Sequence, residues 1–495
     1  MEFKRQSGIL LHPTSLPGDY GIGSLGEEAY EFIDFLVAAD QKLWQILPLG
    51  PTGYGDSPYQ SFSAFAGNPL LISLERLKED GLLAADDLKT EKEFALDYVD
   101  YDQVTEFKYP LFEKAFQTFK RDAAKSIEDK FQRFCCENSD WLDDYALFKT
   151  LKECFEGQPW YEWDEDIKLR RSEAINHYQE TLQDRIKFHK FIQYIFFKQW
   201  NRLKAYANEN YIKIVGDIPI FVAYDSADVW ANPELFSLDE DKKPINVAGV
   251  PPDYFSETGQ LWGNPLYDWQ KLKETDYDWW IDRFETTLEL VDIVRLDHFR
   301  GFAAYWAVPY GEKTAVRGKW KEGPGRDFFR KVKDELKKLP IIAEDLGVIT
   351  DEVEELRDYF KLPGMNVLQF GFNSQDDNNH LPHNYTKNSV VYTGTHDNNT
   401  VLGWYNNADD EAREYAIEYL KASEDNICWD FLQAAWASVS KIAIAPLQDI
   451  LSLNSEARMN TPGTTKGNWK WRYRKEMLDV NLSKKLKRLT GIYHR

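Results

Sequence analysis

The chain has 495 residues, of which 43% are hydrophobic and 29% charged, a balance that is typical of a globular protein with a large core. Lys and Arg number 60 against 82 Asp and Glu, so the formal net charge of -22 argues against a surface for nucleic acid. The four cysteines form no C-x-x-C pair, which argues against a disulfide framework or a zinc site. The N-terminus lacks the apolar core of a signal peptide, and no apolar run reaches the roughly 18 residues of a membrane span, so we expect a soluble, cytoplasmic protein.

Short apolar segments alternate with amphipathic segments along most of the chain. The apolar ones predict strands at residues 8–12, 43–50, 212–222, 291–299, 340–347, 366–372, 389–398 and 442–450. Helical patterns lie between most of them, for example at 26–40, 326–338 and 428–440, but none is evident between the sixth and seventh strands. About eight strands that alternate with helices predict an α/β fold, the (β/α)8 TIM barrel, which reaches this length when it carries insertions.

Two stretches interrupt this alternation. Residues 70–178 carry charged helical patterns and no evident barrel strand, which predicts a helical insertion after strand 2. Residues 223–275 are rich in Pro, Gly and Asn and predict a long loop subdomain after strand 3, and loops of this length are usually functional or disordered. The aromatic residues in this loop argue against disorder. We therefore expect residues 1–495 to form a single barrel with two insertions and no C-terminal β-domain.

Charged residues gather where the predicted strands end, and in a TIM barrel the carboxyl ends of the strands carry the active site. The third, fourth, fifth and seventh strands end in the following residues: Asp217; Arg295, Asp297 and His298; Glu344 and Asp345; His396 and Asp397. A single acidic residue at such a place usually caps the next helix. Acidic residues from four strands on one rim instead favour a catalytic site that separates their pKa values.

This set of residues suits glycosyl transfer better than other chemistries. The chain has no regular metal-ligand spacing, no Gly-rich phosphate loop after a strand and no G-x-S-x-G motif. Glycosyl transfer needs paired carboxylates, one that attacks or stabilises and one that protonates the leaving oxygen. Arg295 shares a strand face with Asp297 because side chains alternate with a period of two, so its guanidinium is expected to keep Asp297 ionised and oriented.

Seven sequence blocks resemble those of the amylomaltases, the 4-α-glucanotransferases of the α-amylase clan. They are "LHPTSLPGDYGIGSLG", "GDIPIFVAYDSADVWANPELF", "GVPPDYFSETGQLWGNPLYDW", "VRLDHFRGF", "IIAEDLG", "YTGTHDNNT" and "GNWKWR". The resemblance runs nearly from end to end of the chain. It implies a transferase that moves a segment of an α-1,4-glucan to the 4-hydroxyl of another glucan or of glucose, by a retaining double displacement.

By position in these blocks, the resemblance implies roles for individual residues. Asp297 is expected to be the nucleophile, Glu344 the general acid and base, and Asp397 the residue that stabilises the transition state. The other residues expected to support the site or bind sugar are Asp217, Arg295, His298, His396, Ser57, Tyr59, Asp253, Tyr254, Phe255, Gln260, Trp262, Asn468, Tyr54 and Tyr101. The loop from 253 to 262 is expected to cover the substrate. For each aromatic residue, packing in the core stays an equal alternative.

The resemblance also bears on cofactors and partners. The third strand reads "GDIPIFV", without the Asn and His that help to hold calcium in α-amylases, so we expect no metal and no cofactor. The expected partners are malto-oligosaccharides, maltose and glucose, as donor or acceptor, and the expected state is a monomer or homodimer. Two alternatives remain: an α-1,4-glucan hydrolase with the same carboxylates, and a glucan-binding protein on an inactive barrel, which would be expected to have lost an acidic residue.

Overall fold

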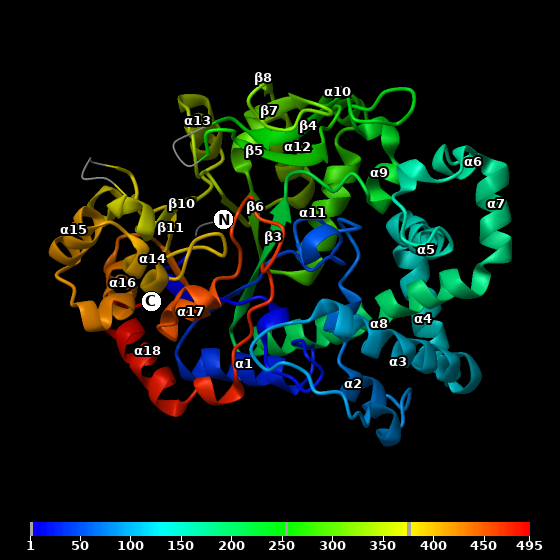
Figure 1. Cartoon of the computed structure of the whole chain (residues 1–495), viewed down its shortest axis with the longest axis horizontal. Coiled ribbons are helices and arrows are strands. Elements are labelled where there is room, and N and C mark those ends of the chain that lie inside the picture. The colour runs from blue at the N-terminus through cyan, green and yellow to red at the C-terminus, as the bar shows by residue number, and fades with distance from the viewer. Residues whose placement is uncertain (1–2, 253–255, 374–377) are drawn as a thin grey trace.

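Eight parallel strands form the centre of the molecule (Figure 1), in a computed structural model that describes residues 3–252, 256–373 and 378–495. They are β1 (Gln6–Leu10), β2 (Leu43–Gln45), β3 (Lys213–Pro219), β6 (Ile293–Asp297), β9 (Ile341–Ala343), β10 (Gly364–Val367), β11 (Ser389–Tyr392) and β12 (Ile442–Pro446). Their hydrogen-bonded order is β10-β11-β12-β1-β2-β3-β6-β9. The amide of Ala343 in β9 donates to the carbonyl of Pro363, just before β10, at 2.9 Å, which brings the two outer strands together. The sheet is a nearly closed barrel, and the eight predicted strands are confirmed.

Branched and aromatic side chains of the barrel strands are buried both inside the barrel and on the face that the helices cover. Ile9, Trp44 and Val215, from three adjacent strands, are fully buried, and burial of each such side chain contributes about 1.5–3 kcal/mol. Gly8 of β1 lies so close to β2 that a Cβ atom at residue 8 would be 2.4 Å from the Cβ of Leu43. A larger residue at this position would push β1 away from β2.

Helices cover the outside of the barrel. They are α1 (Glu27–Ala38), α8 (Gln183–Glu209), α11 (Asp278–Leu290), α12 (Gly325–Leu336), α13 (Asp351–Tyr359), α14 (Val401–Asn407), α15 (Asp410–Leu420), α16 (Ile427–Ala437), α17 (Leu447–Ile450) and α18 (Val480–Ile492). In α1 the buried residues Ala29, Phe32, Ile33 and Leu36 follow the three- and four-residue spacing of one helix face. Within the described residues, no helix is both long enough and apolar enough to cross a membrane.

A group of helices lies between β2 and β3 in the chain, on the right of Figure 1 in blue to cyan. It consists of α2 (Leu74–Glu79), α3 (Tyr101–Asp122), α4 (Lys125–Glu137), α5 (Ser139–Cys154), α6 (Glu165–Lys168) and α7 (Ser172–Thr181), and it is followed by the long helix α8. The indole of Trp200 in α8 donates to the carbonyl of Leu290 in α11 at 2.8 Å, so this helix also belongs to the barrel's outer layer. The helical insertion after strand 2 is thus present, and its treatment as a unit spanning residues 70–178 stays a prediction.

A second, antiparallel sheet lies above the ends of β3 and β6 in Figure 1. Its order is β5 (Gln260–Pro265), β4 (Asn246–Val250), β7 (Ala304–Pro309) and β8 (Lys319–Glu322), and the short helices α9 (Ala227–Ala231) and α10 (Trp269–Glu274) flank β4 and β5 in the chain. The sequence predicted only a long loop over residues 223–275. This sheet could not be predicted because β4 pairs with β7, which comes after the next barrel strand, and local patterns do not reveal such pairing.

The segment that follows β12 returns to the loops at the carboxyl ends of the strands. The amide of Asn460 donates to the carbonyl of His396, in the loop after β11, at 3.1 Å. Further along, the buried guanidinium of Arg472 donates to the carbonyls of Leu16 at 3.2 Å and Gly18 at 2.9 Å. These contacts fix residues 458–472 beside the rim that carries the predicted active site.

Candidate active site

Asp217, Arg295 and Asp297 form a chain of ion pairs at the ends of β3 and β6. The two strands are neighbours, with Asp217 in register with Arg295. Nη1 of Arg295 donates to Oδ2 of Asp217 at 2.6 Å and to Oδ1 of Asp297 at 2.9 Å. The side chains of Asp217 and Arg295 are 0% and 5% exposed, whereas that of Asp297 is 26% exposed. The contact between Arg295 and Asp297 expected from the strand period is therefore present, and only Asp297 of the three is open to a ligand.

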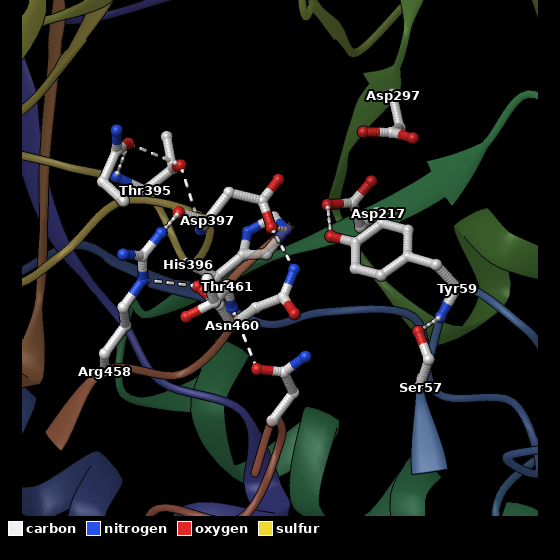
Figure 2. A network of polar contacts seen from close by, with 12 residues as sticks. Ser57, Tyr59, Asp217, Asp297, Thr395, His396, Asp397, Arg458, Asn460 and Thr461 are labelled. Carbon is white, nitrogen blue, oxygen red and sulfur yellow. Dashed lines mark hydrogen bonds and ion pairs between the residues drawn. The ribbon is translucent and has the colours of Figure 1, made fainter. Parts of the chain in front are cut away.

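Asp217 also accepts a hydrogen bond from Tyr59, which is oriented by the loop after β2. The hydroxyl of Tyr59 donates to Oδ2 of Asp217 at 2.9 Å, and the Tyr59 amide donates to Oγ of Ser57 at 3.2 Å (Figure 2). Burial raises the pKa of Asp217, Arg295 opposes this effect, and the negative charge of Asp297 adds to it. A buried and a partly exposed acidic group thus share one guanidinium, so their charges are only partly balanced.

Glu344 follows β9 and is held by two backbone amides. Its Oε2 accepts from the amide of His298 at 2.6 Å, and its Oε1 accepts from the amide of Leu346 at 3.0 Å. The residue is 8% exposed. Burial raises the pKa of Glu344 to about 8, and the nearby charge of Asp297 contributes to the rise. His298 adopts the left-handed conformation with φ 50°, which is uncommon for a residue with a side chain and turns its amide toward Glu344.

Asp397 lies in the loop after β11 and is held by the segment that follows β12. The side-chain amide of Asn460 donates to Oδ1 of Asp397 at 2.6 Å, and Nη2 of Arg458 donates to the Asp397 carbonyl at 2.6 Å. Figure 2 shows both residues reaching Asp397 from the same side. The Asp397 side chain is 45% exposed. This segment fixes the backbone and one carboxylate oxygen, and leaves the group accessible.

Three rings pack beside these carboxylates. The rings of Tyr59 and His396 are stacked, with centroids 5.2 Å apart at 15°, and the Trp469 ring lies 5.7 Å from Tyr59 and 5.9 Å from His396. Burial lowers the pKa of His396, which keeps its imidazole neutral at pH 7. Aromatic faces of this kind pack well against the C–H-rich faces of sugar rings.

A sequence profile described as 4-alpha-glucanotransferase matches residues 11–478. The chain belongs to the 4-alpha-glucanotransferase family. It is similar to the 4-alpha-glucanotransferase of Synechocystis sp., with 53% identity over 99% of this chain and 98% of the relative. It is also similar to that of Thermus thermophilus, with 50% identity over 95% of each chain.

The fold is similar to those of solved amylomaltase structures. The amylomaltase from Streptococcus agalactiae in complex with acarbose has a TM-score of 0.96 and 45% identity, and the match covers 99% of this chain and 100% of that one. The amylomaltase from Corynebacterium glutamicum has a TM-score of 0.79 at 17% identity, over 99% of this chain and 75% of that chain, and shows the shared fold alone. The enzyme is thus a 4-α-glucanotransferase of α-glucan metabolism, and the hydrolase alternative is not favoured.

The other residues expected to bind glucan in this 4-α-glucanotransferase lie in different surroundings. The Trp262 ring meets His298, the residue after Asp297, edge to face at 4.8 Å, and its indole donates to Oε1 of Gln260 at 3.1 Å, so Gln260 orients this ring. The side-chain amide of Asn468 accepts from the Thr461 amide and donates to the Thr464 carbonyl, each at 3.0 Å, so it shapes the loop after β12.

The two remaining tyrosines differ sharply in exposure. Tyr54 is 77% exposed, whereas Tyr101 is 6% exposed and its hydroxyl donates to the Trp469 carbonyl at 2.8 Å. This placement favours a role for Tyr101 in supporting Trp469 over direct contact with glucan. Asp253, Tyr254 and Phe255 lie outside the described residues.

Arg458, Asn460 and Trp469 were not among the residues predicted for the site from the sequence. All three come from the loop after the eighth strand, and every loop at this rim of a barrel can contribute to the site. The segment "ARMNTPGTTKGNW" has the polar, Gly-containing composition of such a loop, and this was the available signal. Among the residues that the structure describes, no group of three or more His, Cys, Asp or Glu is arranged to hold a metal ion.

Proposed function

We propose that this 4-α-glucanotransferase works by double displacement, with Asp297 as nucleophile, Glu344 as general acid and base, and Asp397 as transition-state stabiliser. The observation that carries the proposal is the contrast between two carboxylates. Asp297 is partly exposed and bound to Arg295, whereas Glu344 is buried with its pKa raised to about 8. A site that keeps one carboxyl group protonated near neutral pH beside a paired carboxylate suits glycosyl transfer.

In the first step, a carboxylate oxygen of Asp297 attacks the anomeric carbon of the donor glucan. The bond from that carbon to the leaving 4-oxygen breaks, and Glu344 gives its proton to this oxygen. In the second step, the 4-hydroxyl of an acceptor attacks the same carbon, Glu344 takes the hydroxyl proton, and Asp297 is released. Two inversions give a retained α-linkage.

Asp397 is proposed to bind sugar hydroxyls as positive charge develops on the ring. Its 45% exposed carboxylate, fixed through Asn460, can accept hydrogen bonds from a ligand with little reorganisation. The stacked rings of Tyr59 and His396 are proposed to face the donor glucose, and the edge of Trp262 to close the site from the antiparallel sheet.

Malto-oligosaccharides, maltose and glucose are the proposed donors and acceptors. The solved relative from Streptococcus agalactiae, in complex with acarbose, supports an oligosaccharide ligand. We place the enzyme in the cytoplasm as a monomer or homodimer. Cell fractionation and light scattering test these two points: activity recovered outside the cytoplasmic fraction, or a larger assembly, would refute them.

Product analysis with pure maltotriose tests the proposed chemistry. Transfer yields glucose together with maltopentaose and longer species, whereas hydrolysis yields only glucose and maltose with new reducing ends. Asp297→Asn is expected to abolish both products while its circular dichroism stays that of wild type. Asp351→Asn, at an exposed position at the start of α13, is the matched control and should keep full activity. Near-wild-type turnover by Asp297→Asn would mean that another residue is the nucleophile.

A further inference from the structure

Arg300 is a buried arginine to which no role in the reaction has been given. It lies in the short turn Phe299–Phe302 after β6 and is 6% exposed. Among the described residues no carboxylate forms an ion pair with it within 4.0 Å, Glu352 acts on its charge only from farther away, and its Nε has no hydrogen-bond partner. Burying a guanidinium without a carboxylate partner is costly, so the contacts that Arg300 does make are of interest.

Within the described part of the chain, two contacts of the Arg300 side chain lead to different parts of the fold. Its Nη1 donates to the backbone carbonyl of Val348, in the loop after β9. Its guanidinium carbon lies 3.8 Å from the centre of the Trp320 ring, on β8 of the antiparallel sheet. Trp320 in turn packs edge-on against Trp306 of β7, with centroids 5.2 Å apart at 67°. The guanidinium therefore links the antiparallel sheet to the loop that follows Glu344.

The same two turns hold the Glu344 carboxylate. The amide of His298, two residues before Arg300, binds Oε2, and the amide of Leu346, two residues before Val348, binds Oε1. The hydrogen bond from Arg300 to the Val348 carbonyl therefore connects the two backbone segments whose amides bind Glu344. Gly347, between Leu346 and Val348, has φ 89°, a conformation that glycine adopts readily. Val348 itself is 51% exposed, so packing alone restrains this turn weakly.

We propose that Arg300 is a positioning residue for Glu344: it locks the His298 and Leu346 amides in place, and Trp320 holds Arg300 from the antiparallel sheet. The inference rests on the proposed role of Glu344 as general acid and base. The antiparallel sheet thereby gains a part in the reaction, although it could not be predicted from the sequence. If Trp320 did not hold Arg300, the turn that binds Glu344 would loosen and the proton donor would be misplaced.

The test compares two reactions that differ in their need for Glu344. Transfer between maltotriose molecules needs a proton given to the leaving oxygen and a proton taken from the acceptor. Reaction of α-maltosyl fluoride with azide needs neither: fluoride leaves as an anion when Asp297 attacks, and azide then displaces Asp297 from the anomeric carbon. A defect in proton transfer therefore slows the first reaction only, whereas a general structural defect slows both.

Arg300→Gln is expected to lower kcat for maltotriose transfer by about tenfold, below the ~100-fold that a misplacement of 1 Å can cause. With α-maltosyl fluoride and azide it should stay within about twofold of wild type. Trp320→Ala, at a 40% exposed position, should show the same split with a smaller loss. Arg326→Gln is the matched control. The guanidinium carbon of this arginine lies 4.7 Å from the centre of the Tyr359 ring, away from the turns that hold Glu344, so the variant should keep full activity in both reactions.

An equal loss in both reactions, or no loss with maltotriose, would overturn the proposal. If Arg300→Gln does not fold, Trp320→Ala decides, because it keeps Arg300 and removes only the ring that holds it, at a 40% exposed position. Glu344→Gln separates this inference from the proposed function. If Glu344→Gln slows maltotriose transfer but not the reaction of α-maltosyl fluoride with azide, and the Arg300 and Trp320 variants do not show this difference, only the positioning role is wrong. If Glu344→Gln slows both reactions equally, the role proposed for Glu344 is wrong.

Discussion

Replacing Glu344 with Gln should stabilise the folded protein at alkaline pH while it removes activity. The folded state raises the pKa of Glu344 from its ordinary value of 4.5 to about 8, because the side chain is buried beside Asp297. Between these two values the folded protein holds a proton that the unfolded chain releases. Stability from this group is therefore fully present below pH 4.5 and is lost as pH rises through 8. Gln has a similar shape and does not titrate, so the variant should not lose this stability.

The size of the effect follows from the same values. At about 1.4 kcal/mol per pH unit, a rise from 4.5 to about 8 corresponds to about 5 kcal/mol. The amides of His298 and Leu346 oppose the rise because they favour the ionised form. In Glu344→Gln one of these two amides faces the NH2 group, which cannot accept a hydrogen bond, so the Gln side chain is bound less well than Glu. This mismatch does not depend on pH and cancels between the two conditions. Because pH 5 to about 8 spans three units, we expect the variant to gain about 4 kcal/mol relative to wild type at pH 9 compared with pH 5.

Urea unfolding followed by tryptophan fluorescence at pH 5 and pH 9 measures this gain. The unfolding midpoint of wild type should fall from pH 5 to pH 9 more than the midpoint of Glu344→Gln. Glu355→Gln, at an exposed carboxylate beside Arg326, is the control and should follow wild type at both values. Parallel curves for wild type and Glu344→Gln would refute the idea that burial holds a proton on Glu344.

Three further substitutions test the contacts around the site. Asn460→Ala removes the 2.6 Å bond to Asp397 and should lower kcat about tenfold with KM for maltotriose nearly unchanged; a change in KM alone would contradict a transition-state role. Tyr59→Phe removes the hydroxyl bound to Asp217 but keeps the ring on His396, so kcat/KM should fall about tenfold, and wild-type kinetics would show that this bond is dispensable. Trp262→Ala opens the site beside His298 and should raise the ratio of new reducing ends to transfer products; an unchanged ratio would argue against a water-excluding role.

The barrel and its acidic rim could be predicted because both depend on local patterns. Each barrel strand is a short apolar run, and the residues that matter for chemistry stand where these runs end, so chain position alone places Asp217, Asp297 and Glu344 on one rim. The period of two was enough to bring Arg295 beside Asp297.

The groups that orient these acids could not be predicted, because they come from distant segments or from the backbone. Asn460 meets Asp397 across 63 residues. Glu344 is held by hydrogen bonds from two backbone amides, and residue identity does not indicate which backbone N–H will bind a side chain. Asp345 shows that a residue on the rim can also be structural. It stands next to Glu344, yet its carboxylate binds Arg357 and the Met365 amide and so joins β9 to β10. Two adjacent acidic residues thus have different roles: Glu344 has the proposed catalytic role, and Asp345 joins two strands.

The charge on Asp297 links the two steps of the proposed reaction. This charge raises the pKa of Glu344 and of Asp217 in the free enzyme. When Asp297 becomes an ester in the glycosyl-enzyme, its charge is gone, so both pKa values should fall. Glu344 then stays ionised and can take the acceptor's proton in the second step, and Asp217 remains the ion-pair partner of Arg295. Infrared titration of enzyme trapped with a 5-fluoroglycosyl fluoride should show the Glu344 carboxyl band lost at lower pH than in free enzyme. An unchanged titration would mean that Asp297 does not control the switch of Glu344 from acid to base.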